Sequence, residues 1–267
     1  MTNLDSLFWY HTFFLNDKEQ VLNKDLSNRV LQGEWCHNAE IDLFMEQMKE
    51  VNSGTVLDVG TNDGYFALLF EKLGALSTSA DACDRTTRRA IYEFLGKQDR
   101  FVHTNLYQLD KMGGVYDYIW CQDVICHLEH PLLAFRIFRK ICTKKIFLGV
   151  DRFTCDDVDF EFYADWNVGP SKVCIYTNYD YTYVFTEDFL KETLIDCGFM
   201  NPRIKFSYTS VGQNNMTNCG TRVIDVYEAE VNPDEREDSW WKSLDWTTIE
   251  PWPDKNDDVP LNPMLHG

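Results

Sequence analysis

The stretch TVLDVGTNDGYFALLFEKLGA, residues 55–75, predicts a strand, a glycine-containing loop and a helix in direct succession. TVLDVG is a short apolar run rich in valine, which is typical of a buried strand. YFALLFEKLGA has apolar residues at helical spacing and a glycine, Gly74, at its end. A loop between such a strand and helix lies at the carboxyl edge of an α/β sheet, where ligands bind.

Strands and helices alternate on both sides of this unit. A helix is expected in CHNAEIDLFMEQMKEVNSG, and further strands in LSTSAD, RFVHTNLYQL, YDYIWCQDV and KKIFLGVDRF, with the helices TTRRAIYEFLG and PLLAFRIFRKIC between them. After a long aromatic segment come a helix, TEDFLKETLIDCGF, and two strands, RIKFSYTSV and TRVIDVYEAEV. This order predicts an α/β fold with a doubly wound, mostly parallel, seven-stranded sheet that has an antiparallel edge strand.

Three regions are expected along the chain. Residues 1–35 form an aromatic N-terminal extension or lid, and residues 36–230 form the main domain, with an aromatic insertion at about 153–185. Residues 231–267 form an acidic tail with four tryptophans, which favours an arm held against the protein over a disordered segment.

The net charge of −18 disfavours a nucleic-acid partner, because affinity for a phosphate backbone comes mostly from Lys and Arg, although a local basic groove stays open. No apolar run approaches the roughly 20 residues of a membrane-spanning helix. The nine cysteines include no CxxC pair, which predicts reduced thiols, a cytoplasmic protein and no structural metal site. The oligomeric state is left open.

The loop from Asp58 to Gly64 has the spacing G-x-x-x-G, whereas a dinucleotide site uses G-x-G-x-x-G. Two carboxylates, Asp58 and Asp63, flank it and would repel a pyrophosphate. They suit a ligand with an ammonium group and no phosphate, such as S-adenosylmethionine (SAM). The alternative is an ordinary strand–helix turn without a ligand.

Further polar residues follow the next strands. Asp81 ends the second strand, where a carboxylate can bind both ribose hydroxyls. After the third strand, Asn105 can pair with an adenine amino group and Leu106 can pack on the ring. Each has a plainer interpretation, since Asp81 could be a solvated loop acid and Asn105 a turn cap. Arg85 leaves a nicotinamide dinucleotide phosphate site open as an alternative.

VLDVGTNDGYFALLFEKLGA resembles the first motif of the class I SAM-dependent methyltransferases, which have a Rossmann-like fold. The ordered set FWYHTFFL, GEW, LDVGTNDGYFA and VICHLEHPLLAF is similar to a subgroup that includes relatives of the tRNA wobble-uridine carboxymethyltransferase. The resemblance implies a set of residues that would bind the methionine part, the ribose and the adenine of SAM, or would lie beneath the cofactor or over it. These residues are Asp58, Gly60, Thr61, Asn62, Gly64, Asp81, Ala82, Asn105, Leu106, Gln122 and Trp35.

One departure from the subgroup is Cys126, which replaces a tyrosine that helps the carboxymethyl-transferring relatives read their modified cofactor. This favours ordinary SAM. His127 is the candidate general base, and Tyr10 and His11 are candidates for a lid over the site. The alternatives are a histidine that only binds the loop backbone and an aromatic strip packed on the core.

The sequence therefore predicts a methyltransferase acting on oxygen or nitrogen of a small-molecule or glycan-type acceptor. Three alternatives remain at this point: a wobble-uridine modifying enzyme, a non-catalytic SAM-binding scaffold that recruits a partner through its tail, and a nicotinamide oxidoreductase.

Overall fold

The computed structural model describes residues 13–14, 21–22, 35–36, 41–128, 130–152, 174–177, 182–212 and 221–234. Most of the expected N-terminal extension, most of the aromatic insertion and the tail beyond residue 234 lie outside these residues. The three domain boundaries therefore stay predictions.

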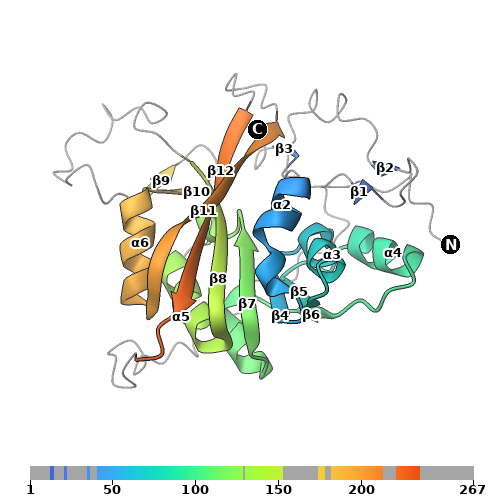
Figure 1. Cartoon of the computed structure of the whole chain (residues 1–267), viewed down its shortest axis with the longest axis horizontal. Helices are drawn as coiled ribbons and strands as arrows, with labels where there is room; N and C mark the ends of the chain where they lie inside the picture. Colours follow the sequence, from blue (N-terminus) through green and yellow to red (C-terminus); the bar gives the residue numbers. More distant parts are fainter. Residues whose placement is uncertain are drawn as a thin grey trace.

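A single large sheet organises the described part of the chain (Figure 1). Its strands, in spatial order, are β3 (Trp35–Cys36), β11 (Phe199–Gly212), β12 (Thr221–Val231), β8 (Cys142–Asp151), β7 (Tyr116–Gln122), β4 (Thr55–Val59), β5 (Leu76–Asp81) and β6 (Phe101–His103). The five strands from β8 to β6 are parallel to one another. β12 runs antiparallel to both β8 and β11. The predicted fold class is confirmed, with the two-residue β3 as an addition at the outer edge.

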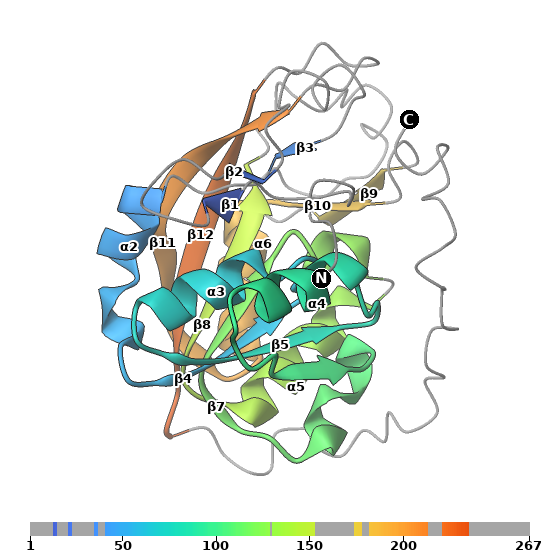
Figure 2. The ribbon, with the colours of Figure 1, turned by 90° about the vertical axis from the view of Figure 1, so that its right-hand side faces the viewer.

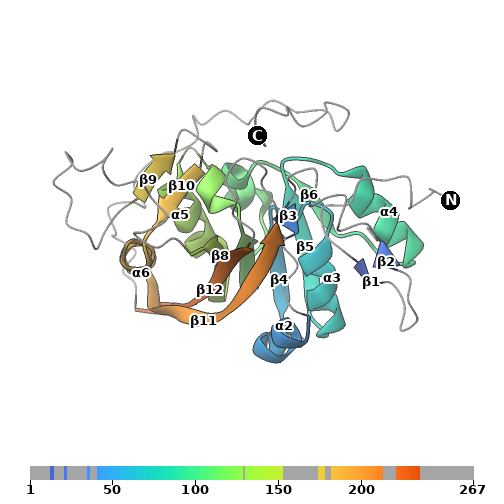
Figure 3. The same cartoon turned by 90° about the horizontal axis from the view of Figure 1, so that it is seen from above.

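The helices cover both faces of the sheet, as Figure 3 shows from above. One face carries α2 (Ile41–Gln47), the 3-10 turn η2 (Lys49–Val51), α3 (Tyr65–Lys72) and α4 (Thr86–Phe94). The other carries α5 (Pro131–Ile141), α6 (Glu187–Asp196) and the 3-10 helix η3 (Leu106–Met112). Each layer buries its own core. Trp120 of β7 is the largest fully buried side chain of the first core, and its ring contacts Phe44, Phe66 and Phe70.

Helix ends follow their local sequence. Gly64, with φ of +85°, precedes α3, and Pro131 begins α5. Thr186 caps α6, since its hydroxyl oxygen accepts a hydrogen bond from the backbone N–H of Phe189 at 3.4 Å. Gly198 follows α6 with φ of +87°. Thr186 and Gly198 thus mark the two ends of this helix, as a threonine N-cap and a C-terminal glycine commonly do.

Short elements gather beyond the carboxyl ends of the parallel strands (Figures 1 and 2). β9 (Cys174–Thr177) and β10 (Thr182–Phe185) form a hairpin from the aromatic insertion, and β10 contacts the 3-10 turn η4 (Ile125–His127). A second hairpin joins β1 (Phe13–Phe14) to β2 (Val21–Leu22). Both segments that the sequence left without a defined structure thus supply strands.

Two further properties concern the described residues alone. None of their helices is long and apolar enough to cross a membrane. The described cysteine side chains are free thiols, at positions Cys83, Cys121, Cys126, Cys142 and Cys197.

Candidate cofactor and acceptor site

The loop between β4 and α3 turns through three left-handed residues, Gly60, Asn62 and Gly64, with φ of +71°, +52° and +85°. Gly60 tolerates no side chain, because a Cβ there would lie 2.1 Å from Cγ2 of Val124. The backbone N–H groups of Gly60 and Thr61 both donate to the carbonyl oxygen of Ala80, at 2.8 and 3.2 Å. The loop is therefore tied to the carboxyl end of β5.

Asp58 holds the loop from inside. It is 2% exposed, and its Oδ2 accepts hydrogen bonds from the Thr61 hydroxyl at 2.7 Å and the Ala67 N–H at 3.1 Å. Burial raises the pKa of its carboxyl group to about 7, and the charges of Asp81 and Asp63 add to this rise against the two hydrogen bonds. Such a carboxylate gains free energy from a cation brought beside it.

Asp81 connects two loops at the end of β5. Its oxygens accept hydrogen bonds from the N–H of Asn62 at 2.9 Å and of Cys83 at 2.8 Å. Burial raises its pKa, and the charges of Arg85 and Arg88 act in the opposite direction. The carbonyl oxygen of Ala82 lies 3.0 Å from Nε2 of His103. Asp81 is thus an ordered loop anchor and not a freely solvated acid.

Asn105 and Leu106 begin η3. The side-chain oxygen of Asn105 accepts a hydrogen bond from the N–H of Tyr107 at 3.0 Å, so the turn-cap interpretation holds for this oxygen. Leu106 is 8% exposed and packs in the core. Neither observation tests the predicted contacts with adenine.

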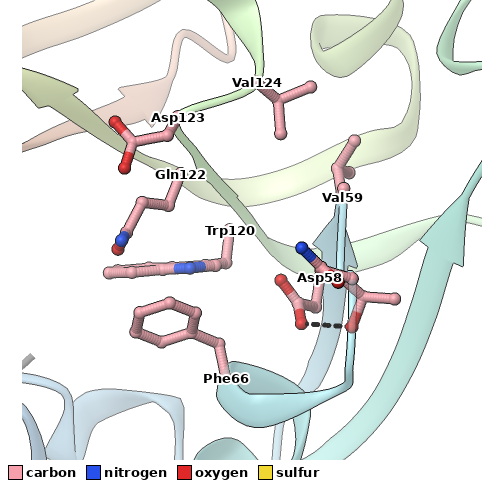
Figure 4. Close-up of a pocket in the computed structure, with 10 residues that line it drawn as sticks. Asp58, Val59, Phe66, Trp120, Gln122, Asp123 and Val124 are labelled. Atoms are coloured by element: carbon pink, nitrogen blue, oxygen red, sulfur yellow. Dashed lines mark hydrogen bonds between the residues drawn. The ribbon is translucent and has the colours of Figure 1, made fainter. Parts of the chain in front are cut away.

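A cavity opens where β4 and β7 end (Figure 4). Asp58 lies on its β4 side, whereas the side chains of Gln122 and Asp123 extend on the opposite side, above the ring of Trp120. The lining residues are Asp58, Val59, Gly60, Thr61, Asn62, Phe66, Trp120, Gln122, Asp123 and Val124. Five predicted cofactor residues meet here. Five others do not line it: Gly64, Asp81, Ala82, Asn105 and Leu106.

Sequence reasoning missed five of the lining residues: Val59, Phe66, Trp120, Asp123 and Val124. Trp120 could have been predicted from the sequence of β7. Residues two apart in a strand face the same side of the sheet, so Trp120 shares the face of Gln122. Trp120 is fully buried, and its Nε1 has no hydrogen-bond partner within the described part of the chain. No sequence signal marked Asp123, which adopts φ of +52°.

The predicted catalytic residues are placed only in part. His127 is exposed in η4, where its backbone N–H donates to the carbonyl oxygen of Val124 at 3.0 Å, and it does not line the cavity. Tyr10 and His11 lie outside the described residues. Trp35 belongs to β3, opposite Gly212 of β11. Cys126 is partly buried, and burial raises the pKa of its thiol well above the usual value.

Residues 29–159, just under half of the chain, match the family described as "Methyltransferase domain". The match includes the Asp58–Gly64 loop, Asp81 and the whole cavity lining. A search of curated protein sequences found no significant match.

Several methyltransferases of known structure have a similar fold. Magnesium protoporphyrin IX methyltransferase from Synechocystis PCC 6803, with bound S-adenosylhomocysteine (SAH), is 18% identical, with a TM-score of 0.51 over 72% of this chain and 81% of that one. The 1,6-didemethyltoxoflavin-N1-methyltransferase from Burkholderia thailandensis has 17% identity and a TM-score of 0.51, over 72% of this chain and 76% of that one. An O-methyltransferase family protein from the same organism has 14% identity and a TM-score of 0.51, over 73% and 56%.

The family match supports SAM as the cofactor. The buried Asp58 carboxyl group in the cavity matches the ammonium group of such a ligand. The wobble-uridine subgroup receives no support from these comparisons.

Proposed function

We propose that this enzyme transfers a methyl group from SAM to oxygen or nitrogen of a small-molecule or glycan-type acceptor. The observation that carries the proposal is the cavity at the ends of β4 and β7, with Asp58 on one side and Gln122 and Asp123 on the other. Two methyltransferases of the same fold are named for small ring compounds, a porphyrin and a toxoflavin precursor, which supports an acceptor of that size.

The cofactor would lie across the carboxyl edge of the sheet. Its methionine part would contact Asp58, Gly60, Thr61, Asn62 and Gly64, and its adenosine would extend toward β5 and β6. There Asp81 and Ala82 would hold the ribose, and Asn105 and Leu106 would frame the adenine. Gln122 would lie beneath the cofactor and Trp35 would cover it.

The chemistry asks little of the protein beyond alignment. SAM supplies, when bound, a methyl group on a positively charged sulfur. The residues of the chain then hold the acceptor atom in line with it, about 3 Å away, and keep water out. A base is needed only for an acceptor that keeps its proton at neutral pH. His127 is our candidate for that role, with Tyr10 and His11 in a closing segment.

Calorimetric titration with SAM, SAH and NAD(P) tests the proposal. We expect micromolar binding of SAM and SAH, weakened at least about tenfold by Asp81→Ala, which corresponds to about 1.4 kcal/mol. Asp110→Asn, which changes a carboxylate paired with Lys140, serves as the control. Folded protein that binds neither adenosyl compound would refute the proposal, and binding of NAD(P) instead would favour an oxidoreductase.

The wobble-uridine reading rests only on the ordered motif set in the sequence. Cys126 in place of the subgroup tyrosine and the net charge of −18 weigh against it. We therefore place it second and test it through the salt dependence of tRNA binding.

A further inference from the structure

The carboxyl group of Asp58 has one bonded and one unbonded oxygen. Oδ2 accepts both hydrogen bonds, from the Thr61 hydroxyl at 2.7 Å and from the Ala67 N–H at 3.1 Å. Oδ1 accepts none from the described residues, and none of their cations forms a salt bridge with Asp58. The side chain is 2% exposed and lines the cavity. In Figure 4 a dashed line marks the bond at one oxygen, whereas the other oxygen lies on the side of the Trp120 ring.

Trp120 adds a donor to the same cavity. It is fully buried, and its indole N–H has no partner within the described part of the chain. The cavity therefore contains one buried acceptor and one buried donor that lack partners. Leaving such groups unpaired costs free energy, which a ligand recovers when it supplies the missing partner. A ligand with an ammonium and a carboxylate on one carbon, such as the amino-acid part of SAM or SAH, supplies both.

The groups around Asp58 disfavour its charge in the ligand-free protein. Burial is the largest cause of its pKa of about 7, and the charges of Asp81 and Asp63 add to the rise against the two hydrogen bonds. Asp58 also acts on Cys121 of β7 and Tyr92 of α4, but burial raises the pKa of both, so they stay neutral near pH 7. At pH 7 the Asp58 carboxyl group is therefore protonated in about half of the molecules.

The other charged groups at this edge belong to its two ends. Asp123 lines the cavity on the side away from Asp58 (Figure 4). Arg85 and Arg88 act on Asp81 and lower its pKa, whereas burial, the largest cause, raises it. Asp81 is therefore a second group whose titration can accompany cofactor binding, and a test has to separate it from Asp58.

We propose that the ammonium group of the cofactor, on entering the cavity, expels a proton from Asp58 and binds to Oδ1 in its place. This inference rests on the proposed function and adds a pH control to its cofactor site. An α-ammonium group stays charged below about pH 8, and it stabilises a carboxylate that it touches far more than a neutral carboxyl group. Cofactor affinity therefore falls as the pH falls below 7, because the proton competes with the ammonium.

The exchange conserves atoms and charge. The O–H bond of the Asp58 carboxyl group breaks, its electron pair stays on oxygen, and the proton passes to water or buffer. An N–H of the ammonium then donates to Oδ1, while Oδ2 keeps its bonds to Thr61 and Ala67. The opposite arrangement, in which a protonated Asp58 donates to the cofactor carboxylate, would take up protons near pH 7.

Calorimetric titration of the full chain with SAH, in buffers of low and high ionisation enthalpy, counts the protons exchanged on binding. From the Asp58 pKa of about 7 we expect release of about 0.9 proton at pH 6 and about 0.5 at pH 7. The Kd should be at least about fivefold higher at pH 6 than at pH 7.5. 5′-Methylthioadenosine, which has the adenosine and the sulfur but no amino-acid part, should show neither effect. Its ribose reaches Asp81, so any pH dependence that it shares with SAH belongs to that residue.

Asp58→Asn removes the titrating group and keeps the shape of the side chain. It should abolish the proton release at pH 6 and make the Kd for SAH independent of pH over this range. The matched control Asp196→Asn, which changes an exposed acid at the end of α6, should behave as the wild type. The buffer comparison on wild-type protein needs no variant, so it tests the inference even where Asp58→Asn does not fold.

Four outcomes would overturn the inference: SAH binding without proton release at pH 6, proton uptake near pH 7, equal release with 5′-methylthioadenosine, and unchanged release in folded Asp58→Asn. Folded wild-type protein that binds neither SAM nor SAH at any of these pH values would refute the proposed function itself, and the inference with it. The two failures are therefore distinguishable.

Discussion

Asp58 is a buried acid, and its burial disfavours the ionised carboxylate. Its pKa of about 7 should therefore make the stability of the protein depend on pH. Its folded pKa lies above the unfolded value, so it binds a proton in the folded state between about pH 4 and pH 7. The stability that this proton contributes is present at low pH and is lost as the pH rises through the folded pKa.

We therefore predict that Asp58→Asn flattens this loss. From pH 5 to pH 8, the unfolding free energy of the variant should shift in its favour, relative to wild type, by about 2–3 kcal/mol, since one pKa unit is worth about 1.4 kcal/mol. Urea unfolding of the ligand-free proteins measures this shift. Asp196→Asn, at an exposed position, is the control, and an equal pH dependence of Asp58→Asn and wild type would contradict the prediction.

A comparison of Gly60 with Gly113 separates the cost of backbone strain from the cost of a steric clash. Both have a left-handed φ, +71° and +74°, but a Cβ at Gly60 would meet Val124 at 2.1 Å, whereas a Cβ at Gly113 would meet nothing within 4 Å. We predict that Gly113→Ala costs about 1 kcal/mol of stability and Gly60→Ala at least about 3 kcal/mol. Thermal or urea unfolding gives both values.

The double variant Gly60→Ala/Val124→Ala isolates the clash. Its loss of stability should be smaller than the sum of the two single losses, because removing the valine methyl groups makes room for the new Cβ while the φ strain remains. Strict additivity of the two substitutions would show that Val124 is not the obstacle.

At the scale of elements, one buried arginine of α4, Arg88, contacts the residues packed around this helix. Arg88 is 1% exposed, pairs with Asp84 at 2.7 Å and Asp99 at 3.1 Å, and its guanidinium lies 3.2 Å from the centre of the Phe101 ring. Its neighbour Arg89 also pairs with Asp84 but is 49% exposed. The two adjacent arginines therefore differ in burial more than in partners.

We predict that Arg88→Ala lowers the unfolding free energy by about 3 kcal/mol, and Arg89→Ala by less than about 1 kcal/mol. Denaturant titration of both variants checks this. Because Arg88 also lies against Gly64, where its Cγ is 3.1 Å from the position of an added Cβ, Arg88→Ala should weaken SAM binding as well. Similar losses in the two variants would mean that burial does not decide the contribution of the pair.

The elements that sequence predicted well are those with local signals. The strand at Thr55–Val59, the helix after Gly64 and the cap at Thr186 each depend on a few neighbouring residues. The position of Tyr208 near Gln122 could not be predicted in this way, because it depends on the register of β11 with β12 and of β12 with β8. The role of Gly149 is hidden for the same reason, since only the fold shows that Gln122 lies over it.

At the scale of the whole molecule, the net charge of −18 makes a further prediction. We expect at most weak binding of tRNA at 50 mM salt, with a slope of log K against log salt near zero, because few phosphate contacts would release counterions. Filter binding or fluorescence anisotropy with total tRNA measures this. A tight complex that weakens steeply between 50 and 200 mM salt would restore the wobble-uridine reading.

β12 is the last strand of the sheet in sequence but lies inside it, between β8 and β11. On the ribosome, β11 leaves the exit tunnel before β12 and can pair only with the two-residue β3, while β8 presents an open edge. In a nascent chain the edge of β8 that β12 later covers therefore stays unpaired until about residue 231 has emerged. Such an edge is a template for pairing with other chains, so translation speed across this interval becomes a determinant of yield.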